Sequence, residues 1–157
     1  MKPQINVVWF KRDLRLEDHA ALEQASRENL PVLLLFVFEP WLWKDHHTDL
    51  RHWRFLYEAV VDCYRQFQDR GTKLYLFHRE CEEVWILLAE KFRINTVYSY
   101  EETGLEITYQ RDRQLARWFD DRKIHWVEFP CNGVQRRRLN RDGWDKKWKA
   151  QMSQSQH

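Results

Sequence analysis

The amino-acid sequence predicts an α/β fold, a Rossmann-like three-layer sandwich built around a five-stranded parallel sheet. Short, almost continuously apolar runs alternate with longer amphipathic segments along the chain. Runs rich in β-branched and aromatic residues are typical of strands that are buried on both faces. Regular alternation with helices favours parallel strands, right-handed crossovers and helices on both faces of the sheet. The predicted strands lie at residues 5–10, 31–38, 73–78, 95–100 and 124–129.

The first two helices follow from local signals. The segment "HAALEQAS" (19–26) is the first helix, and Asp18 is its expected N-cap. The second helix spans about residues 50–67, because apolar residues recur there on one face of a 3.6-residue period. Gly71 is its expected stop. The apolar residues of that face are Leu50, Trp53, Leu56, Tyr57, Val60, Val61, Tyr64 and Phe67.

The later segments divide the chain into a domain and a tail. A third helix presents apolar residues between 84 and 92, and a polar, Arg-rich helix runs through about 105–122. Residues 1–130 form the predicted domain. Residues 131–157 lack a strand pattern and are interpreted as a basic linker or an appended helix. The basic residues of this tail are Arg136, Arg137, Arg138, Arg141, Lys146, Lys147 and Lys149.

Composition indicates a cytoplasmic protein of one domain. The chain has 157 residues and a formal net charge of +2, which is too small to imply nucleic-acid binding by the whole domain. Its three cysteines are far apart, which argues for reduced thiols rather than a disulfide framework or a zinc site. The N-terminus lacks the long apolar run of a signal peptide, and no stretch approaches the roughly 20 apolar residues of a membrane span, so no membrane association is expected.

The expected ligand site is the edge of the sheet where the strands end. Ligands of open parallel sheets bind outside the carboxyl ends of the strands. No glycine-rich phosphate loop follows any strand, and aromatic walls with a few charges suit a flat, conjugated, partly polar ligand. The alternative is that these charges are solvated or paired with one another. The candidate residues are Arg12, Asp13, Phe36, Phe38, Glu39, Glu101 and Glu102, with Trp41 and Trp43 nearby.

Other side chains are interpreted as structural. His46 and His47 are adjacent in a charged loop, and no further ligands at helical spacing support a metal site. Trp53, Trp85 and Trp118 lie on predicted helices and are expected in the core. In the basic tail, Trp144 and Trp148 are one helical turn apart, so a linker that packs on another domain is favoured over a nucleic-acid patch.

Several spaced motifs resemble the N-terminal domain of the DNA photolyase/cryptochrome family. "WFKRDLRLEDHAAL" is similar to the signature of that domain, "LFVFEP" to its second strand and "RHWRFL" to the start of its second helix. "EETGLEITYQRDR" and "NGVQRRRLNRDGWDKKW" are similar to later segments, so the resemblance covers residues 5–150. Lys11 and His19 depart from the family pattern, in which Arg and Asn are usual. The resemblance implies the strand order 3-2-1-4-5.

The resemblance also implies a function. In this family the α/β domain binds or borders an antenna chromophore, a folate, deazaflavin or flavin, which passes light energy to FAD. A separate helical domain holds FAD and the damaged DNA, and the parent enzyme is deoxyribodipyrimidine photolyase, a carbon–carbon lyase. We expect the protein to be a monomer. We also expect that it does not repair DNA alone, because the helical domain is not recognisable in these residues. The alternatives are the same domain of a cryptochrome photoreceptor, or a stand-alone Rossmann-like module that binds a nucleotide or a protein.

The resemblance assigns roles to the strand-end residues. It places Arg12 and Asp13 at contacts with the antenna or the neighbouring domain. It places an acidic residue after the fourth strand, Glu102 rather than Glu101, against the edge of the chromophore ring. Of Phe36 and Phe38, one is expected to stack on a ring and the other to face the core. Arg15 and Asp18 are expected to shape the first loop through an ion pair and a helix cap.

Overall fold

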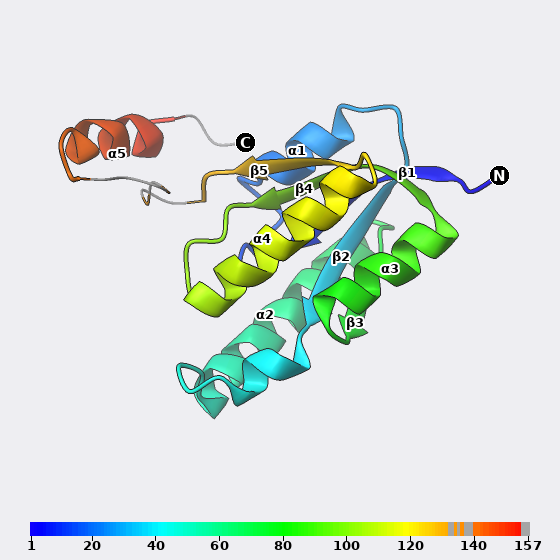
Figure 1. Cartoon of the computed structure of the whole chain (residues 1–157), viewed down its shortest axis with the longest axis horizontal. Coiled ribbons are helices and arrows are strands. Elements are labelled where there is room, and N and C mark those ends of the chain that lie inside the picture. Colours follow the sequence, from blue (N-terminus) through cyan, green and yellow to red (C-terminus); the bar gives the residue numbers. More distant parts are fainter. Residues whose placement is uncertain (132–133, 135, 137–139, 155–157) are drawn as a thin grey trace.

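Five parallel strands form a single sheet in the order β3-β2-β1-β4-β5, which confirms the predicted fold and strand order (Figure 1). The computed structural model describes residues 1–131, 134, 136 and 140–154. All four pairings between neighbouring strands are parallel. The strands are β1 (Gln4–Phe10), β2 (Val32–Phe38), β3 (Leu74–His78), β4 (Arg93–Tyr100) and β5 (His125–Phe129).

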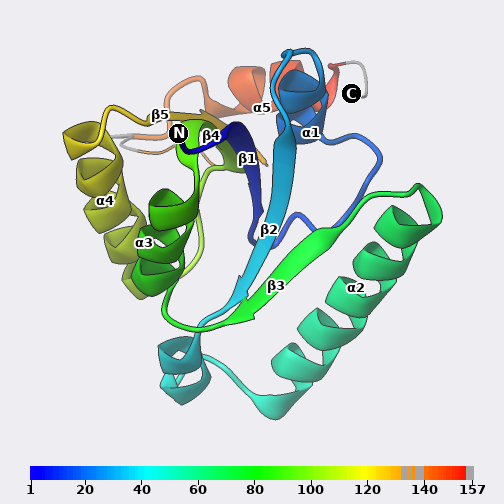
Figure 2. The same cartoon turned by 90° about the vertical axis from the view of Figure 1, so that its right-hand side faces the viewer.

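Helices cover both faces of this sheet. Figure 2 shows α1 (Ala20–Ser26) and α2 (Leu50–Asp69) on one side, and α3 (Cys81–Lys91) and α4 (Glu106–Asp121) on the other. A 3₁₀ helix, η1 (Pro40–Lys44), leaves the end of β2 and leads to α2. The helix α5 (Trp144–Met152) follows the last strand. No helix in the described part of the chain is long and apolar enough to cross a bilayer.

The core consists of two apolar clusters, one on each face of the sheet. Successive strand residues point to opposite faces, so Trp9 joins the cluster under α3 and α4, and Phe10 joins the cluster under α1 and α2. Because helices cover both faces of the sheet, the sequences of β1 and β2 are almost continuously apolar. The two clusters make the strand ends rigid supports for the loops at the carboxyl edge.

The predicted cap of α1 is wrong by one residue. His19 is the N-cap, and its Nδ1 accepts a hydrogen bond of 3.2 Å from the backbone N–H of Leu22. Asp18 instead takes a left-handed backbone conformation, with φ of +51°. Arg15 pairs with Asp18 as expected, with Nη2 and Oδ2 3.8 Å apart. The family's usual Asn and this His fill the same position because both side chains accept a hydrogen bond.

The predicted second helix is confirmed, but its buried face is narrower than expected. Asp49 and His52 form a reciprocal capping box at the start of α2. Gly71 ends it with φ of +70°, the conformation in which glycine is favoured. Leu50 and Tyr57 are exposed, contrary to the prediction, because the centre of the buried face runs through Trp53, Val60, Cys63 and Phe67.

Candidate functional site

The sheet topology brings three of the predicted strand ends together. β1 lies between β2 and β4, with Phe10 beside Phe36 and Val8 beside Tyr98. The residues that follow these strands therefore meet at one edge. A cavity of about 560 Å³ opens there, between the strand ends, η1 and the first turns of α2 and α4. This volume is within the range of roughly 300–1,000 Å³ that small-molecule sites occupy.

The walls of the cavity are largely apolar and aromatic. β1 and β2 contribute Trp9, Phe10 and Phe36, and α2 contributes Trp53. Trp53 is held in place by Trp43 of η1, whose ring stacks on it with centroids 4.5 Å apart and planes 5° apart. The remaining apolar lining residues are Leu14, Val37, Leu42, Phe55, Leu56, Ala59 and Leu105. Such walls favour a flat, conjugated ligand.

A group of four ionisable side chains, Lys11, Glu39, Arg111 and Asp112, closes the inner wall, and we call it the buried charge cluster. Arg111 of α4 pairs with Glu39 at the end of β2, and its Nε donates to Asp112 Oδ1 over 2.9 Å. Lys11 Nζ donates to Asp112 Oδ2 over 2.7 Å. Lys11 and Arg111 also lie over the ring of Trp9, at 4.6 and 5.0 Å from its centroid.

The pKa values of Glu39 and Arg111 in this cluster are shifted. Burial raises the pKa of Glu39 above its ordinary 4.5, although the charge of Arg111 acts in the opposite direction. Burial alone would lower the pKa of Arg111, but the charges of Glu39 and Asp112 raise it. Burial therefore disfavours the charged forms of these side chains, and pairing with opposite charges favours them. The charged form of each member is stabilised by its partners.

One donor of the buried charge cluster, Arg111 Nη2, makes ion-pair contacts but no hydrogen bond with the described residues. Arg111 Nη2 is buried and donates no hydrogen bond to any described residue, although it lies 2.7 Å from Asp112 Oδ1 and 3.6 Å from Glu102 Oε2. Arg111 lines the cavity. A buried donor without an acceptor is costly, so a ligand that offers an oxygen or nitrogen acceptor at this point would be favoured.

Glu102 stands at the opposite side of the cavity and is 3% exposed. Arg12 Nη2 pairs with Glu102 Oε1, and the same oxygen accepts from the backbone N–H of Gly104 over 2.7 Å. A side chain at Gly104 would collide with the Arg12 guanidinium, so glycine allows this close approach. The Arg12 side chain is 59% exposed, which leaves it room to move.

We call the exposed side of the opening the outer rim, and it consists of Arg12, His47, Thr48 and Arg51. Three of these are exposed and Thr48 is half-buried. Thr48 Oγ1 donates to the carbonyl groups of Leu42 and Asp45, which ties the loop after η1 to the rim.

The structure gathers four of the seven predicted site residues around the cavity. Arg12, Phe36, Glu39 and Glu102 line it. Asp13 does not line it, because it points into the protein and its Oδ2 lies 2.8 Å from His19 Nε2. Since His19 Nδ1 accepts from Leu22, Nε2 carries the proton that Asp13 accepts. Glu101 is half-buried beside β5 and also lies outside the lining.

The expectation that Phe36 and Phe38 point to different sides of the strand, one to the core and one to the cavity, was wrong. Residues two apart in a strand share a face. Both rings therefore pack in the cluster under α1 and α2, with centroids 4.8 Å apart. Phe36 also lines the cavity from that face, and Phe38 does not. Trp85 is fully buried as predicted, whereas Trp53 lies between the core and the cavity.

A second cavity, of about 660 Å³, lies between α3 and α4 and meets the first at Glu39 and Arg111. Trp41 lines it and donates to Glu39 over 3.2 Å. Cys81 faces it, and burial raises the pKa of that thiol well above 9.0. The aromatic residue Trp41 is therefore behind the buried charge cluster rather than in the first cavity.

Among the described residues of the tail, Arg136 contacts the edge of the sheet. Arg136 forms two hydrogen bonds of 2.8 and 3.0 Å with Glu128 of β5, and its Nε donates to the carbonyl of Glu102. It therefore belongs to the domain surface and not to a free basic patch. Arg137 and Arg138 lie outside the described residues. Trp144 and Trp148 of α5 are about two-fifths exposed.

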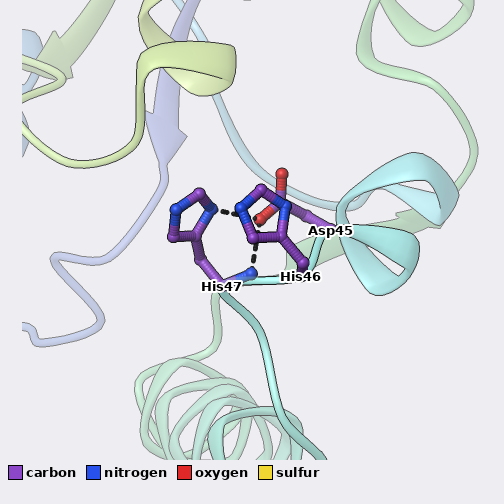
Figure 3. Close-up of side chains that lie close together, drawn as sticks. All are labelled: Asp45, His46 and His47. Carbon is purple, nitrogen blue, oxygen red and sulfur yellow. Dashed lines mark hydrogen bonds and ion pairs between the residues drawn. The ribbon is translucent and has the colours of Figure 1, made fainter.

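The adjacent histidines have a third potential ligand that sequence spacing did not indicate. Figure 3 shows Asp45 beside the rings of His46 and His47, in the loop between η1 and α2. One ligand atom from each lies within 4.8 Å of the others. Among the described residues this is the group whose arrangement is compatible with an ion.

Comparisons with known proteins agree with this architecture. A family model described as DNA photolyase matches residues 6–136. A cryptochrome DASH from Gloeobacter violaceus is 32% identical over 122 residues, which are 74% of this chain and 24% of that protein. A cryptochrome DASH from Synechocystis sp. is 28% identical over 138 residues, covering 83% of this chain and 28% of that protein. The chain spans about a quarter of the length of these relatives.

Solved structures show the same fold. A cryptochrome from Synechocystis sp. superposes with a TM-score of 0.77 at 24% identity, covering 85% of this chain and 28% of that one. An archaeal photolyase from Sulfolobus tokodaii, solved with two FAD molecules, gives a TM-score of 0.74 at 18% identity, covering 93% and 35%. The match of the family model over most of the sequence decides the relationship. This chain belongs to the DNA photolyase family.

Proposed function

We propose that the 560 Å³ cavity binds the antenna chromophore of a photolyase-like protein, a folate, deazaflavin or flavin. The observation that carries this proposal is the unfilled donor of Arg111 in an aromatic-walled cavity at the switch point of the sheet. A heterocycle with a carbonyl group satisfies that donor while its ring lies between apolar walls.

Two carboxylates complement the donor. Glu102 accepts N–H groups from a heterocyclic edge when Arg12 swings away, and the exposed position of Arg12 permits this movement. Glu39 forms an ion pair with Arg111, so its role is to hold Arg111 in position rather than to contact the ligand. Bound chromophore supplies absorption of near-ultraviolet or blue light and transfer of that energy; the residues here bind it, orient it and exclude water.

The acceptor of that energy is proposed to be FAD in the helical domain that the family places after this one. We further propose that the protein to which this domain belongs repairs pyrimidine dimers in DNA with the energy of light. We also propose that it is cytoplasmic. A photoreceptor role is the second candidate, and it is favoured by the 32% identity to a cryptochrome DASH. Repair of a dimer-containing oligonucleotide by the entire protein under blue light distinguishes the two roles.

The chromophore proposal is tested by titration with a folate, a deazaflavin and a flavin. Trp9 and Trp53 line the cavity, so binding is expected to quench tryptophan fluorescence and to shift the ligand absorbance. Glu102→Gln should weaken the ligand that binds by about 10- to 100-fold, the effect of losing a charge-assisted hydrogen bond. Glu101→Gln is the matched control, because the neighbouring carboxylate is outside the cavity. Equal affinities of both variants and the wild type would overturn the proposal.

A further inference from the structure

A compact group of three metal-ligating side chains lies in the loop that joins η1 to α2. Asp45 Oδ1, a ring nitrogen of His46 and a ring nitrogen of His47 lie within 4.8 Å of one another (Figure 3). None of these residues belongs to the buried charge cluster, and the chromophore proposal does not depend on the group. The two imidazole rings are close to each other, with centroids 3.8 Å apart.

The distance between two of these atoms is close to the distance between two ligand atoms of one metal ion. In a tetrahedral zinc site with bonds of roughly 2.0–2.1 Å, ligand atoms are roughly 3.3 Å apart. His47 Nδ1 is 2.9 Å from Asp45 Oδ1, so a small opening of this pair admits an ion between them. The His46 ring needs a movement of about 1.5 Å, which rotation of an exposed side chain provides.

The carboxylate is preorganised for this role. The backbone N–H of His47 donates to Asp45 Oδ1 over 2.8 Å, which orients the oxygen toward the two rings. The Asp45 side chain is 10% exposed and the His47 ring is 55% exposed, which leaves the ring side open for water ligands and for exchange of the ion.

The donor set selects the class of ion. Two imidazole nitrogens and one carboxylate oxygen suit borderline divalent ions such as Zn²⁺ and Ni²⁺, whereas Mg²⁺ and Ca²⁺ prefer all-oxygen sites. We propose that Asp45, His46 and His47 form a binding site for a divalent transition-metal ion at the outer rim of the cavity. Because His47 also lines the cavity, the bound ion stiffens the loop that forms one side of its opening.

The proposal is tested by calorimetric titration of the untagged chain with ZnCl₂ and with MgCl₂. All proteins carry Cys131→Ser, because this exposed thiol would otherwise compete for zinc. We expect one equivalent of Zn²⁺ to bind and Mg²⁺ not to bind. Asp45→Asn and His47→Ala should each weaken zinc binding about tenfold or more. His125→Ala, which removes an exposed histidine on β5, is the matched control and should bind as the parent does.

A second measurement identifies the site independently of affinity. On addition of Zn²⁺, the NMR signals of the His46 and His47 rings should shift, and the signal of His125 should not. No zinc binding, or binding that is unchanged after Asp45, His46 and His47 are all replaced, would overturn the proposal. The loop packs little apolar surface, so these variants should keep the thermal midpoint of the parent in the absence of metal.

Discussion

The inner wall and the outer rim of the cavity both carry arginine–carboxylate pairs, yet the two pairs differ in how far they are removed from water. On the inner wall, Arg111 and Glu39 are 12% and 5% exposed at their side chains. At the rim, Arg12 is 59% exposed while its partner Glu102 is buried. A buried pair leaves an unpaired charge when one partner is lost, whereas an exposed partner is replaced by water. The inner pair therefore holds the fold together, and the rim pair is adjustable.

The largest effect is expected from Arg111→Ala. It leaves Glu39 without its cation and Asp112 with Lys11 alone, at a cost of about 3–5 kcal/mol in the free energy of unfolding. For a chain of this size, that loss lowers the thermal midpoint by roughly 6–20 °C. Arg12→Ala is the matched comparison and should cost about 1 kcal/mol or less. Equal losses from the two variants, measured by urea unfolding, would remove the distinction between the walls.

His19→Ala should have the next largest effect, because Asp13 behind the rim loses its buried donor. The variant loses a helix cap and leaves the buried Asp13 carboxylate with the backbone N–H of Lys11 but without the imidazole donor, at a cost of about 2–4 kcal/mol in the free energy of unfolding. His19→Asn keeps a capping oxygen and should lose less than half as much. Were the two variants equally stable in urea, the cap at residue 19 would contribute nothing to stability.

Adjusting the rim without disturbing the inner wall should change ligand affinity and leave stability nearly constant. Gly104→Ala pushes the Arg12 guanidinium away from Glu102, and Arg12→Ala removes it. Each should raise chromophore affinity by a similar factor, about tenfold, because Glu102 no longer has to release Arg12 first. Each should cost less than about 1 kcal/mol in the free energy of unfolding. The double variant should resemble each single one, because both act on one contact. Additive effects would show that Gly104 acts in another way.

The smallest perturbation is chemical labelling of the thiols, which leaves the native structure intact. Cys131 is exposed, whereas Cys63 and Cys81 are buried. Burial raises the pKa of Cys63 to about 11, so its thiolate is scarce at pH 8. Mass spectrometry should find iodoacetamide on Cys131 first, at a rate that still rises above pH 9 because partial desolvation of the sulfur raises the pKa of this thiol. Rapid labelling of Cys81 in the wild type would contradict the closed inner wall.

The fold could be predicted from the sequence because its signals are local. Continuous apolar strands and a 3.6-residue period determine the elements, and the parallel arrangement follows from their alternation. The errors came from details that need atomic positions. Which side of α2 faces the sheet determined the exposure of Leu50 and Tyr57, and the turn geometry placed the cap at His19 instead of Asp18.

The candidate site was only half predictable. Arg12 and Glu102 follow strands, so the rule for parallel sheets placed them at the edge. Arg111 and Asp112 were missed because they lie inside a helix, where a charged residue is usually solvated. Their sole sequence signal was the Arg-Asp-Arg run in the segment that resembles the photolyase family. Lys11 was visible as a departure from the family pattern, but its pairing with Asp112, 101 positions away, depends on tertiary structure.

The central claim is that the cavity behind the outer rim holds the chromophore, and a crystal structure of the chain with the bound chromophore tests it most directly. Density for the ring is expected between Phe36 and Trp53, with a ring acceptor within hydrogen-bond distance of Arg111 Nη2 and an N–H group facing Glu102. Well-ordered chromophore density in the second cavity, or on the surface of the sheet away from Arg111 and Glu102, would contradict the claim.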